Sequence, residues 1–293
     1  MVNTMEENKK FFTPRQFERA KIARDLFQSL GCPSLMNLKG AIRMNLIRDN
    51  PVTTKDVDLA EHIFGPDIGT VKGKTTRRKP APVVDDHIEI PKELISIHED
   101  ITLAIDGLTI NSLKLLSTIS RDIYYRTVHY MPTTKAPDYR TAINEVCGVY
   151  RRGGFQVKTI LCDNEFHATL TPIAAQSDPP ITMRYAAAQE HVPEAERNIR
   201  VIKERVRATY HRLPYTHLPK ILVKYLISEA TKKLNFFPAK NGVSKYYSPR
   251  MILHQQNLDF NKPCKYSIGL YVQGHDEQNP TNTNASRTLD CIY

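Results

Sequence analysis

The chain has 293 residues and a formal net charge of +10, from 41 Lys and Arg residues against 31 Asp and Glu residues. Hydrophobic residues make up 41% of the chain and charged residues 25%, an ordinary globular composition that excludes wholesale disorder. The basic excess favours a polyanion as partner, with an anionic membrane surface as the weaker alternative. No run of 18 apolar residues is present and the first residues are polar, so we expect neither a membrane span nor a secretory signal.

The five cysteines are scattered, odd in number and without a Cys-x-x-Cys pair: Cys32, Cys147, Cys162, Cys264 and Cys291. A disulfide framework is therefore not expected, and a reducing compartment fits better. The chain stops without a terminating feature, which leaves open that it is a fragment of a longer protein.

The charge is distributed unevenly along the chain. Residues 81–196 carry 10 basic and 16 acidic side chains, whereas residues 197–250 carry 13 basic and 2 acidic ones. An acidic site beside a basic surface suits a metal-dependent enzyme that acts on nucleic acid, because carboxylates hold cations while Lys and Arg hold phosphates. The alternative is a solvated charged face without a ligand.

The N-terminal part of the chain is predicted to be helical. Apolar spacing predicts a helix over residues 14–31 with Gly31 as its C-cap, and Pro33-Ser34 opens a second helix. Glycines, prolines and a basic run mark residues 65–84 as a basic linker. We therefore predict a helical region over residues 1–64 and a domain boundary near residue 85.

The pattern changes after this boundary. We expect strands at residues 101–105, 110–119, 123–131, 157–161 and 181–185, and helices at residues 138–152, from 193 onward and at 219–235. Strands followed by alternating strands and helices indicate an α/β domain with a mixed sheet.

Three carboxylates occupy informative positions in this domain. Asp106 ends the strand at 101–105, Asp163 ends the strand at 157–161, and Glu196 lies in the first turns of the helix that begins at Pro193. The ends of strands in α/β sheets gather functional groups, and three clustered carboxylates repel one another unless divalent cations neutralise them. Oxygen ligands of this kind suit two Mg²⁺ or Mn²⁺ ions. The alternatives are a turn former for each Asp and a helix-dipole partner for the Glu.

The helix that carries Glu196 favours it as the third acid. Arg200, Lys203 and Arg207 follow it at spacings of four, seven and eleven residues and so share its face. The positions four and seven residues after Glu194 hold asparagine and valine, which are poorer partners for a phosphate backbone. Glu194 stays open as the alternative third acid.

These acids and their surroundings resemble the DDE core of retroelement integrases. Asp163 stands in Ile-Leu-Cys-Asp-Asn-Glu-Phe and Glu196 in Val-Pro-Glu-Ala-Glu-Arg-Asn-Ile-Arg, with 56 residues between Asp106 and Asp163 and 32 between Asp163 and Glu196. The Ala-Glu-Arg segment is similar to the one in copia-type integrases of long-terminal-repeat retrotransposons, and the resemblance covers residues 15–275. Glu165 departs from it, since glycine is usual there.

The resemblance implies an RNase H-like fold over residues 85–255, a mixed five-stranded sheet flanked by helices, with residues 256–293 as a C-terminal extension whose truncation stays open. It implies 3′-end processing and strand transfer of element DNA into target DNA, with Asp106, Asp163 and Glu196 holding two Mg²⁺ or Mn²⁺ ions. It further implies a homo-oligomer, a nuclear location with a cytoplasmic particle stage, and no membrane partner.

Basic residues of the glutamate helix are the predicted DNA contacts. Arg200 and Lys203 match positions that contact DNA near the active site in the family that the chain resembles. Together with Arg197 and Arg207 on the same helix, they are the nucleic-acid-binding residues that we predict.

One departure concerns zinc. Copia-type relatives carry an upstream His-His-Cys-Cys module, but here Phe27 and Cys32 stand where histidines are usual, and residues 64–74 lack cysteine. Cys32 and His62 are too few for a four-ligand site, so we expect no structural zinc. The N-terminal helices then have to fold on apolar packing or be held by a neighbouring domain.

Two other functions stay open from the sequence. One is a catalytically inactive, retroelement-derived DNA-binding remnant, and the other is a related RNase H-like nuclease that only cuts. The basic run Lys72–Lys79 has three interpretations: an arm that tracks DNA, a nuclear localisation signal, or a solvated linker. Cys162 is predicted to point to the sheet face opposite Asp163, because strand side chains alternate.

Overall fold

A computed structural model describes residues 5–75, 87–186, 192–260, 264–276 and 284–293. The chain divides into two compact units, one of residues 1–82 with 267–293 and one of residues 83–266. Within the described ranges, no helix is both long and apolar enough to cross a membrane.

The first unit is built on short helices. They are α1 (Met5–Lys9), α2 (Pro14–Ser29), α3 (Leu35–Arg43), α4 (Thr54–Phe64) and α5 (Ile68–Lys74). Thr13 caps α2 in a reciprocal capping box with Gln16, which satisfies two backbone N–H groups at the start of the helix. Apolar side chains of α2, α3 and α4 form one buried cluster, which includes Ala20, Ala23, Phe27, Leu38, Val57, Ala60 and Ile63. The predicted helices are thus present, and apolar packing holds them together.

An ion pair joins α2 to α4 at the rim of this cluster. The Asp56 carboxylate accepts hydrogen bonds from Arg19 Nε and Nη2, each at 2.8 Å, and from the backbone N–H of Thr53, also at 2.8 Å. The Arg19 hydrogen bond lowers the pKa of Asp56 to about 2, against the opposing effect of burial, and the Thr53 hydrogen bonds add to this. Asp56 therefore has two roles: it completes the capping box of α4, and it joins α4 to α2 through the ion pair with Arg19.

A small hairpin completes the first unit. Its antiparallel strands are β6 (Tyr271–His275) and β7 (Thr288–Ile292). Lys72 Nζ on α5 lies 3.0 Å from Asp290 of β7, and the backbone N–H of Arg287 donates to Lys72 O at 2.9 Å. Helix α5 thus occupies the first part of the predicted basic linker, and residues 76–84, with Arg77, Arg78 and Lys79, lie outside the described residues.

The second unit contains a five-stranded mixed sheet in the order β3-β2-β1-β4-β5. The strands are β1 (Asp100–Ile110), β2 (Leu113–Ser120), β3 (Arg126–Tyr130), β4 (Gln156–Cys162) and β5 (Thr182–Tyr185). Strand β1 pairs antiparallel with β2 and parallel with β4, β2 pairs antiparallel with β3, and β4 pairs parallel with β5. This mixed sheet, flanked by helices, is the RNase H-like fold that the sequence predicts.

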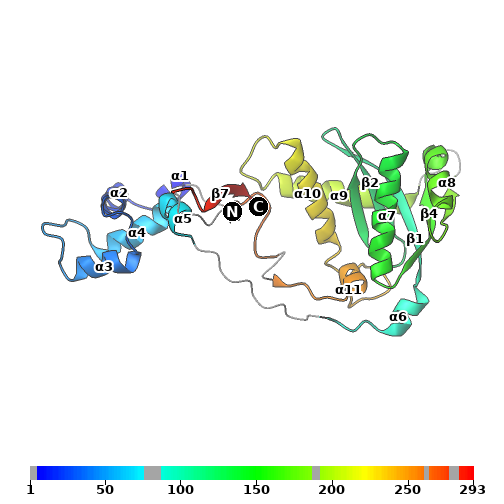
Figure 1. The fold of residues 1–293 in the computed structure, drawn as a ribbon, viewed down its shortest axis with the longest axis horizontal. Helices are drawn as coiled ribbons and strands as arrows, with labels where there is room; N and C mark the ends of the chain where they lie inside the picture. The colour runs from blue at the N-terminus through cyan, green and yellow to red at the C-terminus, as the bar shows by residue number, and fades with distance from the viewer. Residues whose placement is uncertain (1–4, 76–86, 187–191, 261–263, 277–283) are drawn as a thin grey trace. The chain divides into compact units, whose positions relative to one another are not determined.

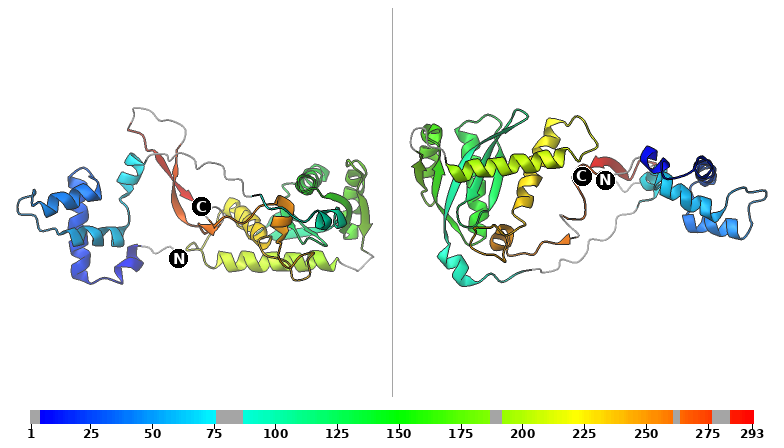
Figure 2. Two further views of the ribbon diagram at one scale, coloured as in Figure 1. Left: turned by 90° about the horizontal axis from the view of Figure 1, so that it is seen from below. Right: turned by 180° about the vertical axis from the view of Figure 1, so that it is seen from behind.

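Helices cover both faces of the sheet, as Figures 1 and 2 show. The helices described in this unit are α6 (Lys92–Ile97), α7 (Ala136–Arg152), the 3-10 turn η1 (Asn164–Phe166), α8 (His167–Ala175), α9 (Pro193–Tyr210), α10 (Lys220–Leu234) and α11 (Pro249–His254). Helix α7 covers one face over the main core, which holds Ile101, Leu103 and Ile105 of β1. Helix α9 crosses the other face, where Ala195 packs in a smaller cluster with Ala104.

The first two strands differ from the prediction. Strand β1 continues five residues beyond its predicted end and places Asp106 inside the strand. Leu108 is buried, so alternation persists after the apolar run stops. The chain reverses at Asn111-Ser112, whose φ values of 46° and 64° suit a two-residue hairpin turn, and the predicted strand 110–119 therefore starts at Leu113.

A close approach joins the end of α7 to α11. Gly153 caps α7, as the sequence predicts for its helix stop, and a Cβ at this position would lie 2.7 Å from the carbonyl oxygen of Leu253. That distance is too short for any side chain, so the glycine permits the two helices to meet here.

We expect Gly153→Ala to destabilise the second unit by about 1–3 kcal/mol, because the new methyl group must push α11 away. Gly148→Ala is the matched control inside α7: its Cβ would meet only the end of Arg152, at 3.6 Å. The control should leave stability unchanged or raise it by about 0.5–1 kcal/mol through helix propensity. Urea unfolding followed by circular dichroism measures both, and equal stability of the two variants would contradict the close approach.

Asp56→Asn should destabilise the first unit by about 1–2 kcal/mol at neutral pH, a figure discounted because the Arg19 side chain is 40% exposed. The folded pKa of Asp56, about 2, lies below the unfolded value near 4, so this contribution is present above about pH 4 and is lost as the pH falls toward 2. Thermal melts at several pH values should show the difference from wild type shrinking with acid. Asp25→Asn, at an exposed position of α2, should show no such trend.

Candidate active site

Strand register sets Asp106 beside Asp163. In the parallel pair β1–β4, Ala104 lies opposite Leu161, so Asp106 lies opposite Asp163, which follows β4 in extended conformation. Neighbouring strands are about 4.8 Å apart and side chains alternate between faces. The two carboxylates therefore leave the sheet as neighbours on one face, the face that α9 covers.

Glu196 reaches the same face from above. Val192 and Ala195, at the start of α9, are buried in a cluster with Ala104 of β1 and Ile119 of β2. Glu196 follows Ala195 directly and is exposed, so it stands at the edge of this contact. The apolar contact of one small residue on the helix with one on the strand thus fixes where the third acid stands.

The electrostatics of Asp106 show that these acids act on one another. Burial raises its pKa, a hydrogen bond of 2.6 Å from the backbone N–H of Gly107 opposes the rise, and the negative charges of Asp163, Glu165 and Glu196 add to it. Glu165 is the member that sequence reasoning noted only as a departure from the integrase pattern. Its position two residues after Asp163 is the signal that could have identified it.

Glu194 is held differently from Glu196. Arg121, just after β2, donates to Glu194 Oε1 from Nε at 3.0 Å and from Nη2 at 2.7 Å. Although burial opposes the shift, a backbone hydrogen bond and the ion pair with Arg121 lower the pKa of Glu194. This pair anchors the first turn of α9 to the end of β2.

A buried polar network holds α9 farther along. Asn198 is 2% exposed, donates to Ser117 Oγ at 2.9 Å and accepts from Arg126 Nε at 3.0 Å. Ser117 is the residue opposite Asp106 in the β1–β2 register. Asn198 therefore locks α9 to the strand next to Asp106, a positioning role that sequence reasoning missed because helix docking decides which residue faces inward.

The predicted DNA-binding residues follow the outer side of α9. Arg197, Arg200 and Arg207 are exposed and Lys203 is half-buried, while Ile202 and Val206 are buried on the inner side. The helix therefore presents basic groups to solvent beyond Glu196, as the spacing predicts.

The donor chemistry of the three acids fits hard divalent cations, because all their ligand atoms are carboxylate oxygens. Burial raises the pKa of Asp106, and the charges of Asp163 and Glu196 add to the rise. Within the ranges that the structure describes, however, no group of three or more His, Cys, Asp or Glu residues is gathered closely enough to hold a metal ion. The acids are thus near enough to interact electrostatically without forming a ligand set.

Cys162 lies between the acids along the chain but on the other face. It is fully buried in the main core, and burial, with the charges of Asp163 and Asp106, raises the pKa of its thiol to about 12. The thiol is therefore protonated and packs as a small apolar group. The predicted orientation of Cys162 is confirmed.

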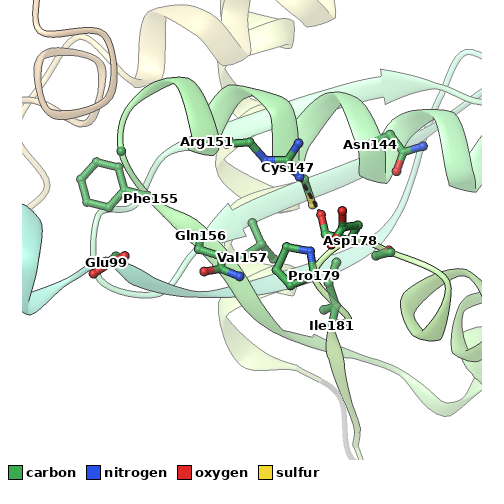
Figure 3. A pocket seen from close by; sticks show the side chains of 12 residues that line it. Glu99, Asn144, Cys147, Arg151, Phe155, Gln156, Val157, Asp178, Pro179 and Ile181 are labelled. Atoms are coloured by element: carbon green, nitrogen blue, oxygen red, sulfur yellow. Dashed lines mark hydrogen bonds between the residues drawn. The ribbon is translucent and has the colours of Figure 1, made fainter.

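A cavity of about 390 Å³ lies where β1 and β4 begin, and Figure 3 shows the residues that line it. Glu99 and Gln156 line it at the start of β1 and β4, Cys147 and Arg151 line it from α7, and Pro179 lies across from them. Since Asp163 follows the far end of β4, this cavity is separate from the acidic face.

No family model matches the chain, and no curated protein matches it. A solved structure, the catalytic core domain of BIV integrase in crystal form I, is similar with 18% sequence identity and a TM-score of 0.38. The match covers 53% of this chain and 93% of that one. The fold assignment here stands on the strand order and pairing of the sheet.

Asn198→Ala should destabilise the second unit by about 1–3 kcal/mol, because it leaves Arg126 Nε and the Ser117 hydroxyl without their partner. Glu204→Ala, at an exposed position of the same helix, is the control and should change stability by no more than about 0.5 kcal/mol. Chemical denaturation followed by circular dichroism measures both. Similar destabilisation in the two variants would show that Asn198 does not fasten the helix.

Proposed function

We propose that this chain is a copia-type retrotransposon integrase, a metal-dependent polynucleotidyl transferase that processes DNA 3′ ends and joins them to target DNA. The observation that carries this proposal is the placement of Asp106, Asp163 and Glu196 on one face of an RNase H-like sheet, with Glu196 on a helix that continues into exposed basic residues. The resemblance of the sequence around these acids supports it.

In this proposal Asp106, Asp163 and Glu196 would hold two Mg²⁺ or Mn²⁺ ions. Such ions, when bound, would activate the attacking oxygen and stabilise the leaving oxygen in phosphoryl transfer. Glu194 takes no part as a ligand, because its carboxylate is paired with Arg121. Glu165 adds negative charge near Asp106 and so increases the electrostatic attraction of this site for cations.

The protein's own residues bind and orient the DNA. Arg197, Arg200, Lys203 and Arg207 project from α9 and pair with backbone phosphates, which aligns the scissile phosphodiester with the acids. Asn198 fixes α9 on β2 through its hydrogen bond with Ser117. The basic residues and Glu196 lie on this same helix and therefore keep fixed positions relative to one another. In end processing, water cleaves a phosphodiester and frees a 3′ hydroxyl. In strand transfer, that hydroxyl attacks a target phosphodiester and displaces a target 3′ oxygen.

The remaining predictions belong to the same proposal. The catalytic core covers residues 85–255, the element ends and target DNA are the partners, and the chain acts as a homo-oligomer. Its place of action is the nucleus, after a cytoplasmic particle stage. Residues 1–64 correspond to the family's zinc module, and apolar packing and the Arg19–Asp56 pair hold their described part together.

One observation favours a second candidate, a DNA-binding remnant without catalysis. The acids of the described chain are not gathered as a metal ligand set. In a remnant the basic face of α9 would still bind DNA, but neither cleavage nor joining would follow. A nuclease that only cuts is separated from an integrase by the absence of joined products.

A strand-transfer assay with labelled duplex ends and Mn²⁺ tests the proposal. Asp163→Asn and Glu196→Gln should each lower the yield of joined product by at least about 100-fold, because each removes a ligand charge. Glu194→Gln should retain most activity, since Glu194 is paired with Arg121.

The controls separate folding from catalysis. Circular dichroism should show that all three variants fold, because none of the three side chains is part of the buried core. Full activity of Asp163→Asn would disprove the catalytic assignment. Cleavage without joining by the wild type would favour the nuclease.

A further inference from the structure

Two arginines lie on the helices that approach each other where α7 ends against α11. Arg152 is the last residue of α7, and Arg250 lies in α11, whose backbone approaches Gly153 so closely that no side chain fits there. This junction lies on the α7 side of the sheet, with Ile252 and Leu253 in the main core, whereas the three acids lie on the α9 side.

A hydrogen-bonded Tyr–His pair lies near both arginines. Tyr125 Oη and His254 Nε2 are 3.1 Å apart, and the two rings meet edge to face with centroids 5.8 Å apart. The charges of Arg250 and Arg152 act on both members. They oppose the rise that burial causes in the pKa of Tyr125, and they add to the fall that burial causes in the pKa of His254.

Among the residues that the structure describes, no carboxylate pairs with the two arginines of this junction. Among the described residues neither Arg152 nor Arg250 forms an ion pair, and Arg250 Nε is buried without a hydrogen-bond partner. The Arg250 guanidinium instead lies over the Phe236 ring, 5.8 Å from its centroid. When Tyr125 donates to Nε2, the His254 ring carries its proton on Nδ1 and offers a further donor.

We propose that this junction binds a backbone phosphate of DNA through Arg152, Arg250 and His254, as a second contact on the face opposite the acids. A phosphodiester carries one charge and two free oxygens, which suits guanidinium groups and a neutral imidazole donor. The proposal rests on the proposed function in one respect, which is that the polyanion is DNA.

The chain around the junction favours a nucleic acid over a free anion. The segment between α10 and α11 exposes Phe237 by 62% and Tyr246 by 86% and also carries Lys240 and Lys245. Exposed aromatic rings among cations stack on bases and hold phosphates, a combination that a site for a small anion does not need. Val243 in this segment donates its backbone N–H to Asp122 O at 3.3 Å, which fixes the segment on the β2–β3 turn beside Tyr125.

Binding of a labelled DNA duplex, followed by fluorescence anisotropy at several KCl concentrations in EDTA, tests the proposal without any catalytic step. Arg152→Gln combined with Arg250→Gln should lower the slope of log affinity against log salt by about 0.9 for each phosphate that the protein no longer neutralises. Arg140→Gln combined with Arg184→Gln removes the same charge from exposed positions of the same unit and is the matched control. If the substitution of Arg250 disturbs α11, the salt dependence of Arg152→Gln alone is measured instead, because Arg152 is exposed.

Equal slopes for the two double variants would overturn the proposal, as would a wild type that does not bind the duplex. Calorimetric titration with inorganic phosphate alone tests the alternative that the junction binds free phosphate and not a phosphate of DNA. Tight phosphate binding together with an unchanged duplex slope would also overturn the DNA contact. A specific change of slope in a protein without strand-transfer activity would uphold this contact while disproving the proposed function.

Discussion

The parallel pairing of β1 with β4 is the constraint on which the candidate site depends. It places Asp106 opposite Asp163, and the alternation of strand side chains turns both toward α9. A shift of one residue in this register would turn one carboxylate into the apolar core under α7. The core on that side, with Ile105 and Cys162 fully buried next to the two acids, holds the register against such a shift.

Helix α9 adds the third acid through contacts of different kinds. Ala195 permits close apolar packing on β1, Arg121 holds Glu194 at the end of β2, and Asn198 bonds to Ser117 in the interior. The helix N-terminus also carries partial positive charge, which offsets part of the repulsion between Glu196 and the two aspartates. These contacts hold α9 in place although three negative charges lie near one another. The resulting group of carboxylates has a chemistry that suits a cation.

The sequence predicted much of this arrangement because strong periodicity marks its longest elements. The helices at 138–152 and 219–235 and the strands at 157–161 and 181–185 agree with α7, α10, β4 and β5. The end of β1 was predicted wrongly, because the apolar run stops at Asp106 while the burial of alternate residues continues to Leu108. The turn that does end the strand, Asn111-Ser112, is a weaker signal than a glycine would be.

Other features depend on packing that no local pattern reveals. From the sequence, Asn198 was noted only as a poor phosphate-binding residue on the face of Glu194. Its hydrogen bond with Ser117 could not be predicted, because it depends on how α9 packs on the sheet. The sequence identifies Gly153 as the end of a helix. It does not reveal that the missing side chain lets α11 pack against this position. The placing of Arg152 and Arg250 at one junction needs that same tertiary contact, since the two residues are far apart in the chain.

The proposed catalysis requires that Asp106, Asp163 and Glu196 form one cation site. Calorimetric titration of Mn²⁺ into the wild type, Glu196→Gln and Glu194→Gln, each with and without DNA, tests this requirement most directly. We predict binding by the wild type, clear weakening in Glu196→Gln and little change in Glu194→Gln. Absence of Mn²⁺ binding by the wild type, even with DNA present, would contradict the shared cation site and leave a DNA-binding protein without a metal centre.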